Sequence, residues 1–321
     1  MLTRRRAVSD LRCQVVLITG GSRGLGLALA HEFANRDCRL AICARDGDEL
    51  ARARKQLEER GARVQAIQCD VGDRDQVRHM VDEVIGYYGH IDVLVNNAGT
   101  ISVAPIENLE LTDFEQAMDV MFWGAVYPTL AVLPQMQRRA QGRIVNITSI
   151  GGKISVPHLV PYSCAKFATV AFSEGLRAEL DPYGIKVVTI VPGLMRTGSH
   201  LNAKFKGNAS REFAWFGIGA ATPIFSISAR RAARSIVRAT ERGSAEVILS
   251  LPAQVAARVH GLAPELTAPV LNLVNRWILP RAGDSPSVSG RQAQSELNSR
   301  IFDAVTALGQ SAAKEFNEVG V

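Results

Sequence analysis

The sequence has few cysteines, and their spacing forms neither a metal site nor a disulfide framework. Its five cysteines include no CxxC pair, and no histidine stands at metal-ligand spacing from any of them. Zinc sites and disulfide-stapled domains both need such regular patterns. We therefore predict reduced thiols, no bound metal and a cytoplasmic location.

Long apolar runs and dense charge clusters are also missing. No stretch reaches the roughly 18 consecutive apolar residues of a membrane-spanning helix, and no apolar run precedes Val15 as it would in a signal peptide. The net charge is +6, but outside Arg4, Arg5 and Arg6 the basic residues are scattered. A nucleic-acid surface needs a clustered basic patch, so we predict no nucleic-acid partner.

The sequence does contain an alternation of short apolar runs and amphipathic segments. With 47% hydrophobic residues among 321, the chain can bury a large core. The predicted strands cover 14–19, 39–44, 63–69, 91–95, 143–148, 186–191 and 246–249. The predicted helices cover 25–35, 48–60, 73–88, 112–139, 160–180 and 229–241. Apolar strands separated by helices predict an α/β fold, a doubly wound parallel sheet of Rossmann type with about seven strands.

A glycine-rich segment from Thr19 to Gly26 follows the first predicted strand and opens the first helix. Glycines allow the backbone to turn tightly and to approach a pyrophosphate closely. The helix start then offers free N–H groups and a positive dipole end to the phosphates. The segment predicts a dinucleotide site, and the alternative is a simple glycine-rich turn.

Five motifs, taken in order, resemble the short-chain dehydrogenase/reductase family. They are TGxxxGxG at 19–26, Asn96-Asn97-Ala98-Gly99 after the fourth strand, Ser149, the pair Tyr162 and Lys166, and Pro192-Gly193 with Thr197. Ser149 stands thirteen residues before Tyr162, as the family's catalytic serine does. The resemblance covers roughly residues 12–250 and leaves the tail unexplained. We therefore assign 1–250 to a Rossmann-type NADP-binding catalytic domain and 251–321 to a helical C-terminal extension.

Tyr162 and Lys166 stand one helical turn apart and share a face of their predicted helix. An ordinary tyrosine has a pKa near 10, and a nearby ammonium is expected to lower it. Tyr162 then exchanges a proton with the substrate oxygen, while Ser149 hydrogen-bonds that oxygen where negative charge develops. The resemblance implies that Lys166 also holds the cofactor ribose. A surface tyrosine and lysine would be the alternative.

The cofactor preference is predicted from the end of the second strand, which reads Ala44-Arg45-Asp46. An acidic residue there would bind the ribose 2′-hydroxyl of NAD, whereas Arg45 and Arg23 can pair with the 2′-phosphate of NADP. We predict NADP(H), with Asp46 binding a ribose as the alternative. From the resemblance, the expected cofactor-binding residues are Thr19, Gly20, Ser22, Arg23, Gly24, Leu25, Gly26, Arg45, Asp70, Val71, Asn97, Ala98, Gly99, Tyr162, Lys166, Pro192, Gly193 and Thr197.

Met121 departs from the family pattern. Family members usually carry an asparagine three residues before a glycine in the long helix, where this chain has Met121 before Gly124. The asparagine organises a proton-relay water in the family, and a thioether cannot donate a hydrogen bond. Two hypotheses follow: a slowed relay that uses the Met121 backbone carbonyl, or an NADP-binding protein with little turnover.

The segment 198–228 stands where the family has its substrate loop. Its aromatic residues predict an apolar lid and a lipophilic carbonyl or secondary alcohol as substrate, although they could instead pack the loop onto the body. The predicted substrate residues are His158, Phe205, Phe213, Trp215 and Phe216. His158 could equally be a surface loop histidine.

Residues 253–279 carry apolar side chains at helical spacing, and three arginines lie in or just after this segment. They predict either a helix packed on its own body or a partner, or a peripheral membrane contact through 253–281. Residues 283–290 read as a linker, and a polar helix follows. The resemblance implies a homodimer or homotetramer formed through 112–139 and 160–180. A sugar-nucleotide epimerase or dehydratase also carries YxxxK, but its glycine spacing is usually GxxGxxG.

Overall fold

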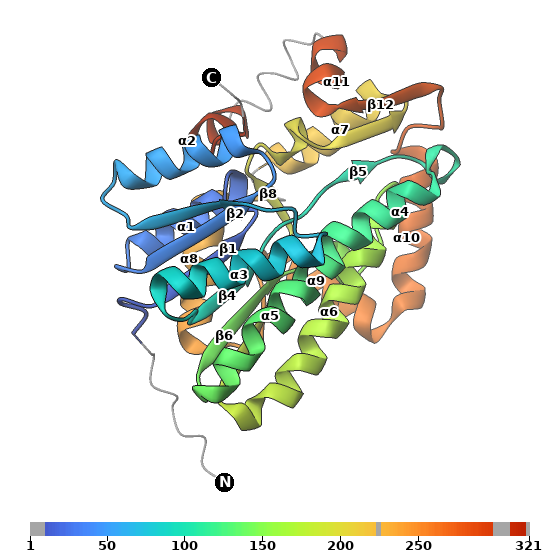
Figure 1. Cartoon of the computed structure of the whole chain (residues 1–321). Coiled ribbons are helices and arrows are strands. Elements are labelled where there is room, and N and C mark those ends of the chain that lie inside the picture. The colour runs from blue at the N-terminus through green and yellow to red at the C-terminus, as the bar shows by residue number, and fades with distance from the viewer. Residues whose placement is uncertain (1–9, 223–225, 298–308, 319–321) are drawn as a thin grey trace.

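The computed structural model describes residues 10–222, 226–297 and 309–318 and contains one seven-stranded parallel sheet (Figure 1). Arg4, Arg5 and Arg6 lie outside the described residues. The strands, in spatial order, are β11 (Glu246–Ile248), β7 (Ile185–Val191), β6 (Gly142–Ile147), β4 (Val93–Asn96), β1 (Val15–Thr19), β2 (Arg39–Ala44) and β3 (Val64–Gln68). The strand order reverses between β1 and β4, and a ligand crevice is expected at the carboxyl ends of strands at such a point.

Helices cover both faces of this sheet, because each of its central strands is apolar on both sides. One face packs α1 (Gly24–Ala34), α2 (Gly47–Glu58) and α8 (Ala229–Arg242). The other face packs α3 (Arg74–Tyr88), α5 (Gly124–Arg138) and α6 (Val160–Leu180). The predicted doubly wound Rossmann-type sheet is therefore confirmed.

The predicted long helix is divided by a π-helical turn. It consists of α4 (Leu111–Met118), the turn at Asp119–Trp123 and then α5. The helix start at 112 also predicts Thr112 as its N-cap, and this is wrong: Glu110 caps α4, and Asp113 closes the capping box from inside the first turn. Residues Leu111–Arg138 are long and apolar enough to cross a membrane by length and composition alone, but half of the most apolar window is buried inside the protein.

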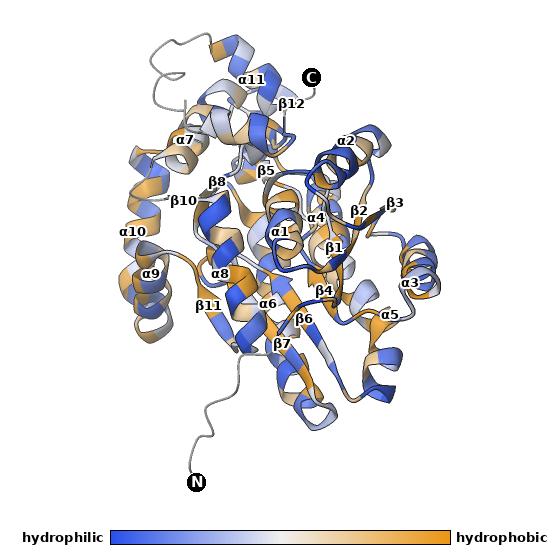
Figure 2. Ribbon diagram, turned by 90° about the vertical axis from the view of Figure 1, so that its left-hand side faces the viewer, coloured by the Kyte–Doolittle hydropathy of each residue, from blue (hydrophilic) through white to orange (hydrophobic). Residues whose placement is uncertain are grey.

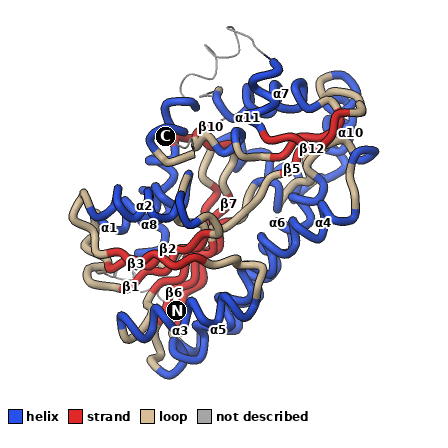
Figure 3. The backbone as a smooth tube through the Cα atoms, turned by 45° about the horizontal axis from the view of Figure 1, so that its top comes forward, coloured by secondary structure: helices blue, strands red, loops and turns tan. Residues whose placement is uncertain are grey.

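A small cap stands beside the carboxyl ends of the main strands. Its sheet has the order β12 (Ser285–Ser289), β9 (Lys204–Gly207) and β5 (Ser102–Val103), and α7 (Ala209–Ala221) and α11 (Gly290–Leu297) pack on it. Figure 3 shows β5 and β12 apart from the main sheet. The predicted loop at 198–228 and linker at 283–290 are therefore wrong, because β9 and β12 pair with each other and bury one face under α7.

The C-terminal extension is not purely helical, since it contributes β12 to the cap. It begins with α9 (Leu251–Leu262) and α10 (Pro264–Trp277), which pack against each other. Pro264 occupies the first position of α10, where its missing N–H costs nothing. Figure 2 shows this helical pair at the edge of the molecule, near α8 and β11. Residues 309–318 return to the beginning of α1.

Candidate active site

A cavity of about 460 Å³ opens at the carboxyl ends of β1, β2, β3 and β4, at the expected switch point. Its walls come from the glycine-rich turn, the ends of β2 and β4, α6 and the segment after β7. Of the predicted cofactor residues, those lining it are Gly20, Ser22, Arg23, Gly24, Leu25, Gly26, Arg45, Val71, Asn97, Ala98, Gly99, Tyr162, Lys166 and Thr197.

The glycine-rich turn is held so tightly that two of its positions admit no side chain. A Cβ atom on Gly26 would overlap the Gly20 carbonyl oxygen, and Gly20 has a φ of +63°. This close packing brings the backbone of the turn to the first residues of α1, where unpaired N–H groups can meet phosphate oxygens. The turn therefore has the shape that a dinucleotide pyrophosphate requires.

Thr19 and Asn97 fasten this turn to the end of β4. The Thr19 hydroxyl accepts hydrogen bonds from the backbone N–H groups of Asn97 (3.0 Å) and Ala98 (3.1 Å). The Asn97 side-chain amide donates to the carbonyls of Thr19 and Gly20, each at 3.0 Å. Thr19 is fully buried and does not line the cavity. Its part is to fix the turn, as Asn97 does from the cavity side.

Ser149, Tyr162 and Lys166 come together where β6 ends and α6 begins. Ser149 interacts with the Tyr162 side chain, and Ser149 Oγ accepts the Gly151 N–H at 3.0 Å. Lys166 Nζ donates to the Ile147 carbonyl at 2.9 Å and lies 5.8 Å from the centre of the Tyr162 ring. The i, i+4 spacing thus brings both side chains to the cavity wall.

The expected lowering of the tyrosine pKa by the lysine is not found in this structure. Burial raises the pKa of Tyr162 above its ordinary value, and only the hydrogen bond with Ser149 opposes this rise. Burial also lowers the pKa of Lys166 to about 8. The physical reason is geometric: the ammonium lies over the ring and donates to a carbonyl, not to the phenol oxygen. Tyr162 is therefore a neutral phenol at pH 7.

Met121 lies inside the π-helical turn and is buried. Its backbone carbonyl lies 3.0 Å from the Thr169 hydroxyl, which shares its one proton between this carbonyl and that of Ala165 at 2.8 Å. The carbonyl suggested above as a site for a relay water therefore already has one protein donor. A carbonyl oxygen has two lone pairs, so a second acceptor position remains.

The end of β2 is rich in charge. Arg45 is well exposed, and its guanidinium lies 3.9 Å from the Asp70 carboxylate. Asp46 caps α2, since its side chain accepts the Glu49 N–H at 2.8 Å. Asp70 accepts the Gly72 N–H at 3.0 Å and does not line the cavity.

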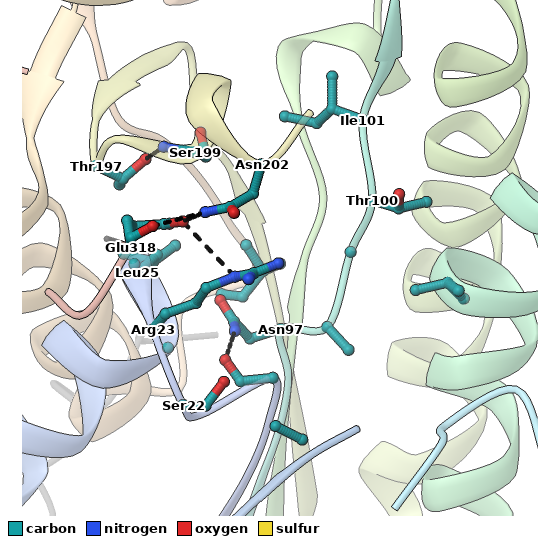
Figure 4. Close-up of a pocket in the computed structure, with 18 of the residues that line it drawn as sticks. Ser22, Arg23, Leu25, Asn97, Thr100, Ile101, Thr197, Ser199, Asn202 and Glu318 are labelled. Carbon is teal, nitrogen blue, oxygen red and sulfur yellow. Dashed lines mark hydrogen bonds and ion pairs between the residues drawn. The ribbon is translucent and has the colours of Figure 1, made fainter. Parts of the chain in front are cut away.

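Arg23 projects from the glycine-rich turn into the cavity (Figure 4). Its guanidinium forms ion pairs with Glu49 (2.6 Å) and Glu318 (3.6 Å). Ser22 also donates to Glu49, at 3.3 Å. The arginine predicted to bind a 2′-phosphate thus already has two carboxylate partners.

The segment after β7 contributes Thr197, whereas Pro192 and Gly193 lie behind the cavity wall. The Pro192 carbonyl accepts the Ile150 N–H at 2.7 Å, which joins this segment to the loop that carries Ser149. Thr197 accepts the Ser199 N–H at 3.2 Å. Pro192 and Gly193 therefore position the wall and do not form it.

The predicted aromatic lid is a core. Phe205 and Phe213 are fully buried and Phe216 nearly so, and their rings contact one another in the centre of the cap. None of them, nor Trp215, lines the cavity. The aromatic side chains are needed to fill the space between β9, β12 and α7, so the packing alternative is the correct one.

His158 is not at an entrance either. It is buried, with a φ of +63°, and its Nδ1 lies 2.8 Å from the Glu212 carboxylate. Glu212 is completely buried and also accepts the Trp215 indole N–H at 2.6 Å. This polar group joins the loop before α6 to α7 and leaves His158 without a place on the cavity wall.

Several cavity residues have no signal in the sequence. Thr100 and Ile101 follow the predicted Asn96–Gly99 motif, Asn202 and Ala203 come from the turn before β9, and Lys204 begins that strand. Glu318 comes from the far end of the chain. Thr100 and Ile101 could have been predicted only because they directly follow a motif. The other residues reach the cavity through tertiary packing.

Comparison with known proteins agrees with this geometry. The sequence pattern of the short chain dehydrogenases matches residues 14–206. The chain belongs to the short-chain dehydrogenase/reductase family. This dehydrogenase/reductase is 38% identical over 273 residues to a dehydrogenase/reductase SDR family protein 7-like from Anopheles gambiae, covering 83% of the chain and 84% of the relative. It is 33% identical to dehydrogenase/reductase SDR family member 7B of Bos taurus, covering 80% and 79%.

Solved structures show the same fold. A short-chain dehydrogenase from Streptomyces avermitilis superposes with a TM-score of 0.70 at 30% identity, covering 82% of this dehydrogenase/reductase and 98% of that chain. A gluconate 5-dehydrogenase from Burkholderia cenocepacia, solved with NADP and tartrate, gives 0.66 at 26% identity, covering 76% and 97%. This chain is therefore an oxidoreductase of a family that uses a nicotinamide cofactor, and its glycine cradle and cavity fit such a group.

Proposed function

We propose that this protein is an NADP(H)-dependent reductase of lipophilic ketones or aldehydes that uses Tyr162 as its proton donor. The observation that carries the proposal is that Tyr162 and the buried Lys166 line the dinucleotide-shaped cavity, with Ser149 interacting with Tyr162. Each group alone is common on protein surfaces. Their convergence beside the glycine-rich turn is what acid–base catalysis at a carbonyl requires.

A bound nicotinamide supplies hydride to the substrate carbon or accepts it in the reverse reaction. The phenol of Tyr162 donates its proton to the substrate oxygen, and the Ser149 hydroxyl hydrogen-bonds the same oxygen as negative charge develops. Tyr162 is protonated at neutral pH, and burial raises its pKa further, so the phenol has a proton to donate. The Lys166 ammonium would hold the cofactor ribose and return a proton toward the tyrosine.

The preference for NADP(H) is supported by two arginines at the cavity and by the role of Asp46, whose carboxylate already caps a helix. Arg23 and Arg45 both reach the cavity, and guanidinium groups pair well with phosphates. Asp46, the acidic alternative, is occupied as the N-cap of α2. The relative solved with NADP adds support from the family.

The lipophilic substrate class is supported by the surroundings of Tyr162, not by the aromatic residues expected at first. The Tyr162 ring packs against the apolar core of the cap, and Ile101 and Ala203 face the cavity nearby. Thr100 and Lys204 add polar edges. A wall that combines these apolar side chains with polar groups can take a small ketone or aldehyde that has an apolar side.

Self-association through α5 and α6 is also part of the proposal. Both helices expose large apolar side chains, including Leu130 and Phe167, and Trp123 just before α5 stacks on Tyr127. Such residues are common at interfaces between subunits. Sedimentation of the purified chain measures the assembly.

The test is NADPH oxidation with a panel of lipophilic ketones and aldehydes, with polar hydroxy-ketones of similar size as the contrast. The proposal expects turnover with members of the lipophilic set and higher kcat/KM with NADPH than with NADH. Turnover confined to polar substrates would refute the substrate class, and a preference for NADH would refute the cofactor assignment.

Met121 motivates a second candidate, an NADP-binding protein with little turnover. Its thioether stands where the family has an amide, and its carbonyl already accepts the Thr169 hydroxyl. Tight NADPH binding without turnover on any member of the panel would favour this candidate.

A further inference from the structure

The last described segment of the chain, 309–318, lies across the start of α1. In Figure 1 it is the red segment beside α2. Phe316 is buried in the core that contains α1 and α8, and Ala313 is buried in the core of the cap. Asn317 donates to the carbonyls of Ser22 and Glu49, each at 2.9 Å. The segment is therefore built into the fold at this place.

This segment uses groups on which a dinucleotide phosphate depends. The Phe316 carbonyl accepts the N–H of Gly24, the first residue of α1, at 2.8 Å. N–H groups at such a helix start are the expected partners of the pyrophosphate. A Cβ on Gly24 would lie 2.5 Å from Glu318 Oε1 and 3.9 Å from Thr197. The Glu318 carboxylate thus lies between Gly24 and Thr197, at the start of the helix.

The carboxylate is held by several partners, two of which are labelled with it in Figure 4. Asn202 Nδ2 donates to Glu318 Oε2 at 2.5 Å, and Arg23 lies 3.6 Å from it. Arg291 donates to the Glu318 backbone carbonyl. Burial raises the pKa of Glu318 to about 7, although Arg23 opposes this rise. Glu49 also faces Arg23, so two acidic groups compete for one guanidinium.

We propose that the C-terminal segment is an autoinhibitory element whose Glu318 carboxylate competes with the phosphates of the cofactor. Two anionic groups cannot share the start of α1 and Arg23 without repulsion. Cofactor binding therefore requires that Glu318 leaves, and its departure removes one of the two carboxylate partners of Arg23, so that a phosphate can take its place. The proposal rests on the proposed cofactor-dependent function and adds regulation of the same site.

The test measures binding, not turnover. NADPH is titrated against the full chain, Glu318→Gln and a chain ending at residue 308, with Glu296→Gln as a matched charge control on α11. Glu296 bonds Ser210 at the surface, away from the cavity. Glu318→Gln is expected to lower the Kd for NADPH by about tenfold, on the scale of losing one unfavourable charge contact, and the truncated chain is expected to bind at least as tightly. Glu296→Gln leaves the Kd unchanged.

Hydrogen exchange in 309–318 gives an independent readout in the full chain. NADPH is expected to increase exchange there as the segment leaves. Slower exchange with NADPH, or a higher Kd in Glu318→Gln, would show that the segment holds the cofactor in place and would overturn the proposal. If neither the full chain nor any variant binds NADPH or NADH, the proposed function fails too. If all of these chains bind NADPH equally well, only the autoinhibitory role of segment 309–318 is rejected.

A separate observation concerns the outer surface of α9 and α10, which we call the α9–α10 face. No residue of α10 is buried. The large apolar side chains exposed along the two helices are Leu251, Val255, Val259, Leu262, Leu266, Val270, Leu273 and Trp277. On α10, the last four stand at the spacing of one helix face. Although α10 packs against α9, it therefore leaves these apolar side chains uncovered by the part of the chain that the structure describes.

Charge indicates what covers this face. Arg258, Arg276 and Arg281 are exposed, and Glu265 is the single acidic residue between Leu251 and Gly283. Arg276 lies over the Trp277 ring, 5.4 Å from its centre. Pairing of two copies would bring two positive faces together, whereas anionic lipid headgroups would neutralise them. We infer that the α9–α10 face binds the surface of an anionic membrane.

The test uses co-sedimentation with phosphatidylglycerol-containing vesicles and with neutral phosphatidylcholine vesicles. The full chain is expected to sediment with the anionic vesicles, and Trp277→Asp is expected to reduce this by about tenfold or more. Leu111→Asp, an equally exposed apolar position on α4, is the control and retains binding. Lack of sedimentation by the full chain overturns the inference. So does a change from oligomer to monomer in Trp277→Asp, which would identify a second copy as the partner.

Discussion

The Lys166 ammonium lies 5.8 Å from the centre of the Tyr162 ring, over the ring and not beside the hydroxyl. Its hydrogen bond goes to the Ile147 carbonyl. The lysine thus acts on the site mainly as a buried cation, and Ser149 is the group that contacts the phenol oxygen. In this arrangement the proton donor, Tyr162, is separate from the Lys166 ammonium, which is expected to bind the cofactor.

Replacement of Tyr162 by Phe removes the proton donor and leaves the ring in place. We expect ketone-dependent NADPH oxidation to fall by about 10²- to 10⁴-fold, the usual scale of general acid catalysis, with little change in the Kd for NADPH. Tyr183→Phe is the control, because Tyr183 is exposed in the short turn that follows α6. Comparable loss in both variants would argue against a catalytic role for Tyr162.

The buried Lys166 gives activity and stability opposite pH dependences. Its pKa falls from 10.5 in the unfolded chain to about 8 in the folded protein. Between these values the unfolded state binds more protons, so this residue's contribution to the free energy of unfolding rises with pH. Affinity for NADPH is expected to fall over the same interval as the ammonium is lost.

The variant Lys166→Met checks both effects. In urea denaturation at pH 7 it should be more stable than the parent. Its affinity for NADPH should not change with pH near pH 8. Lys153→Met, which removes a lysine paired with Glu174 and Glu246, should give no gain in stability. A less stable Lys166→Met protein would contradict this account.

Arg23 and Arg45 are expected to distinguish NADPH from NADH. Loss of a charge-assisted bond to a phosphate costs about 1.5–3 kcal/mol, which is tenfold or more in affinity. Arg23→Ala and Arg45→Ala should therefore raise the KM for NADPH by about tenfold and leave the KM for NADH nearly unchanged. Arg54→Ala, an exposed arginine paired with Glu58, serves as the control. Parallel losses with both cofactors would exclude a 2′-phosphate contact.

Met121→Asn tests whether the proton relay limits turnover. An amide at this buried position can donate and accept hydrogen bonds, so kcat is expected to rise, while burial of the amide lowers the free energy of unfolding. Met121→Leu keeps the position apolar and should leave kcat unchanged. A kcat for the asparagine variant at or below the parent value would count against a limiting relay.

Phe213→Ala tests the reassignment of the aromatic residues from lid to core. Removing a fully buried ring typically costs about 3–5 kcal/mol of stability, so the midpoint of urea unfolding should fall markedly. Trp215→Ala, which removes a partly buried ring that contacts Phe216, should cost less. If Phe213→Ala changed the KM for substrate without changing stability, Phe213 would be a substrate contact after all.

Local sequence determined the sheet, the dinucleotide turn and the catalytic spacing. A strand or helix in this part of the chain is specified by its own apolar period, and Tyr162 and Lys166 share a helix face whatever surrounds them. For that reason the predicted strand and helix positions agree with the structure to within a residue or two. Thr112 was misplaced as a cap because Glu110 and Asp113 offered a better pair.

Only the tertiary structure decided the remaining features, because they depend on residues far apart in the chain. Phe205 and Phe213 became a core when β12 paired with β9 across about 80 residues. The pKa of Tyr162 depends on burial and on where the lysine nitrogen points, which spacing does not fix. Glu318 reaches Gly24 from nearly 300 residues away, and no local pattern encodes a contact that exists only once both cores have formed.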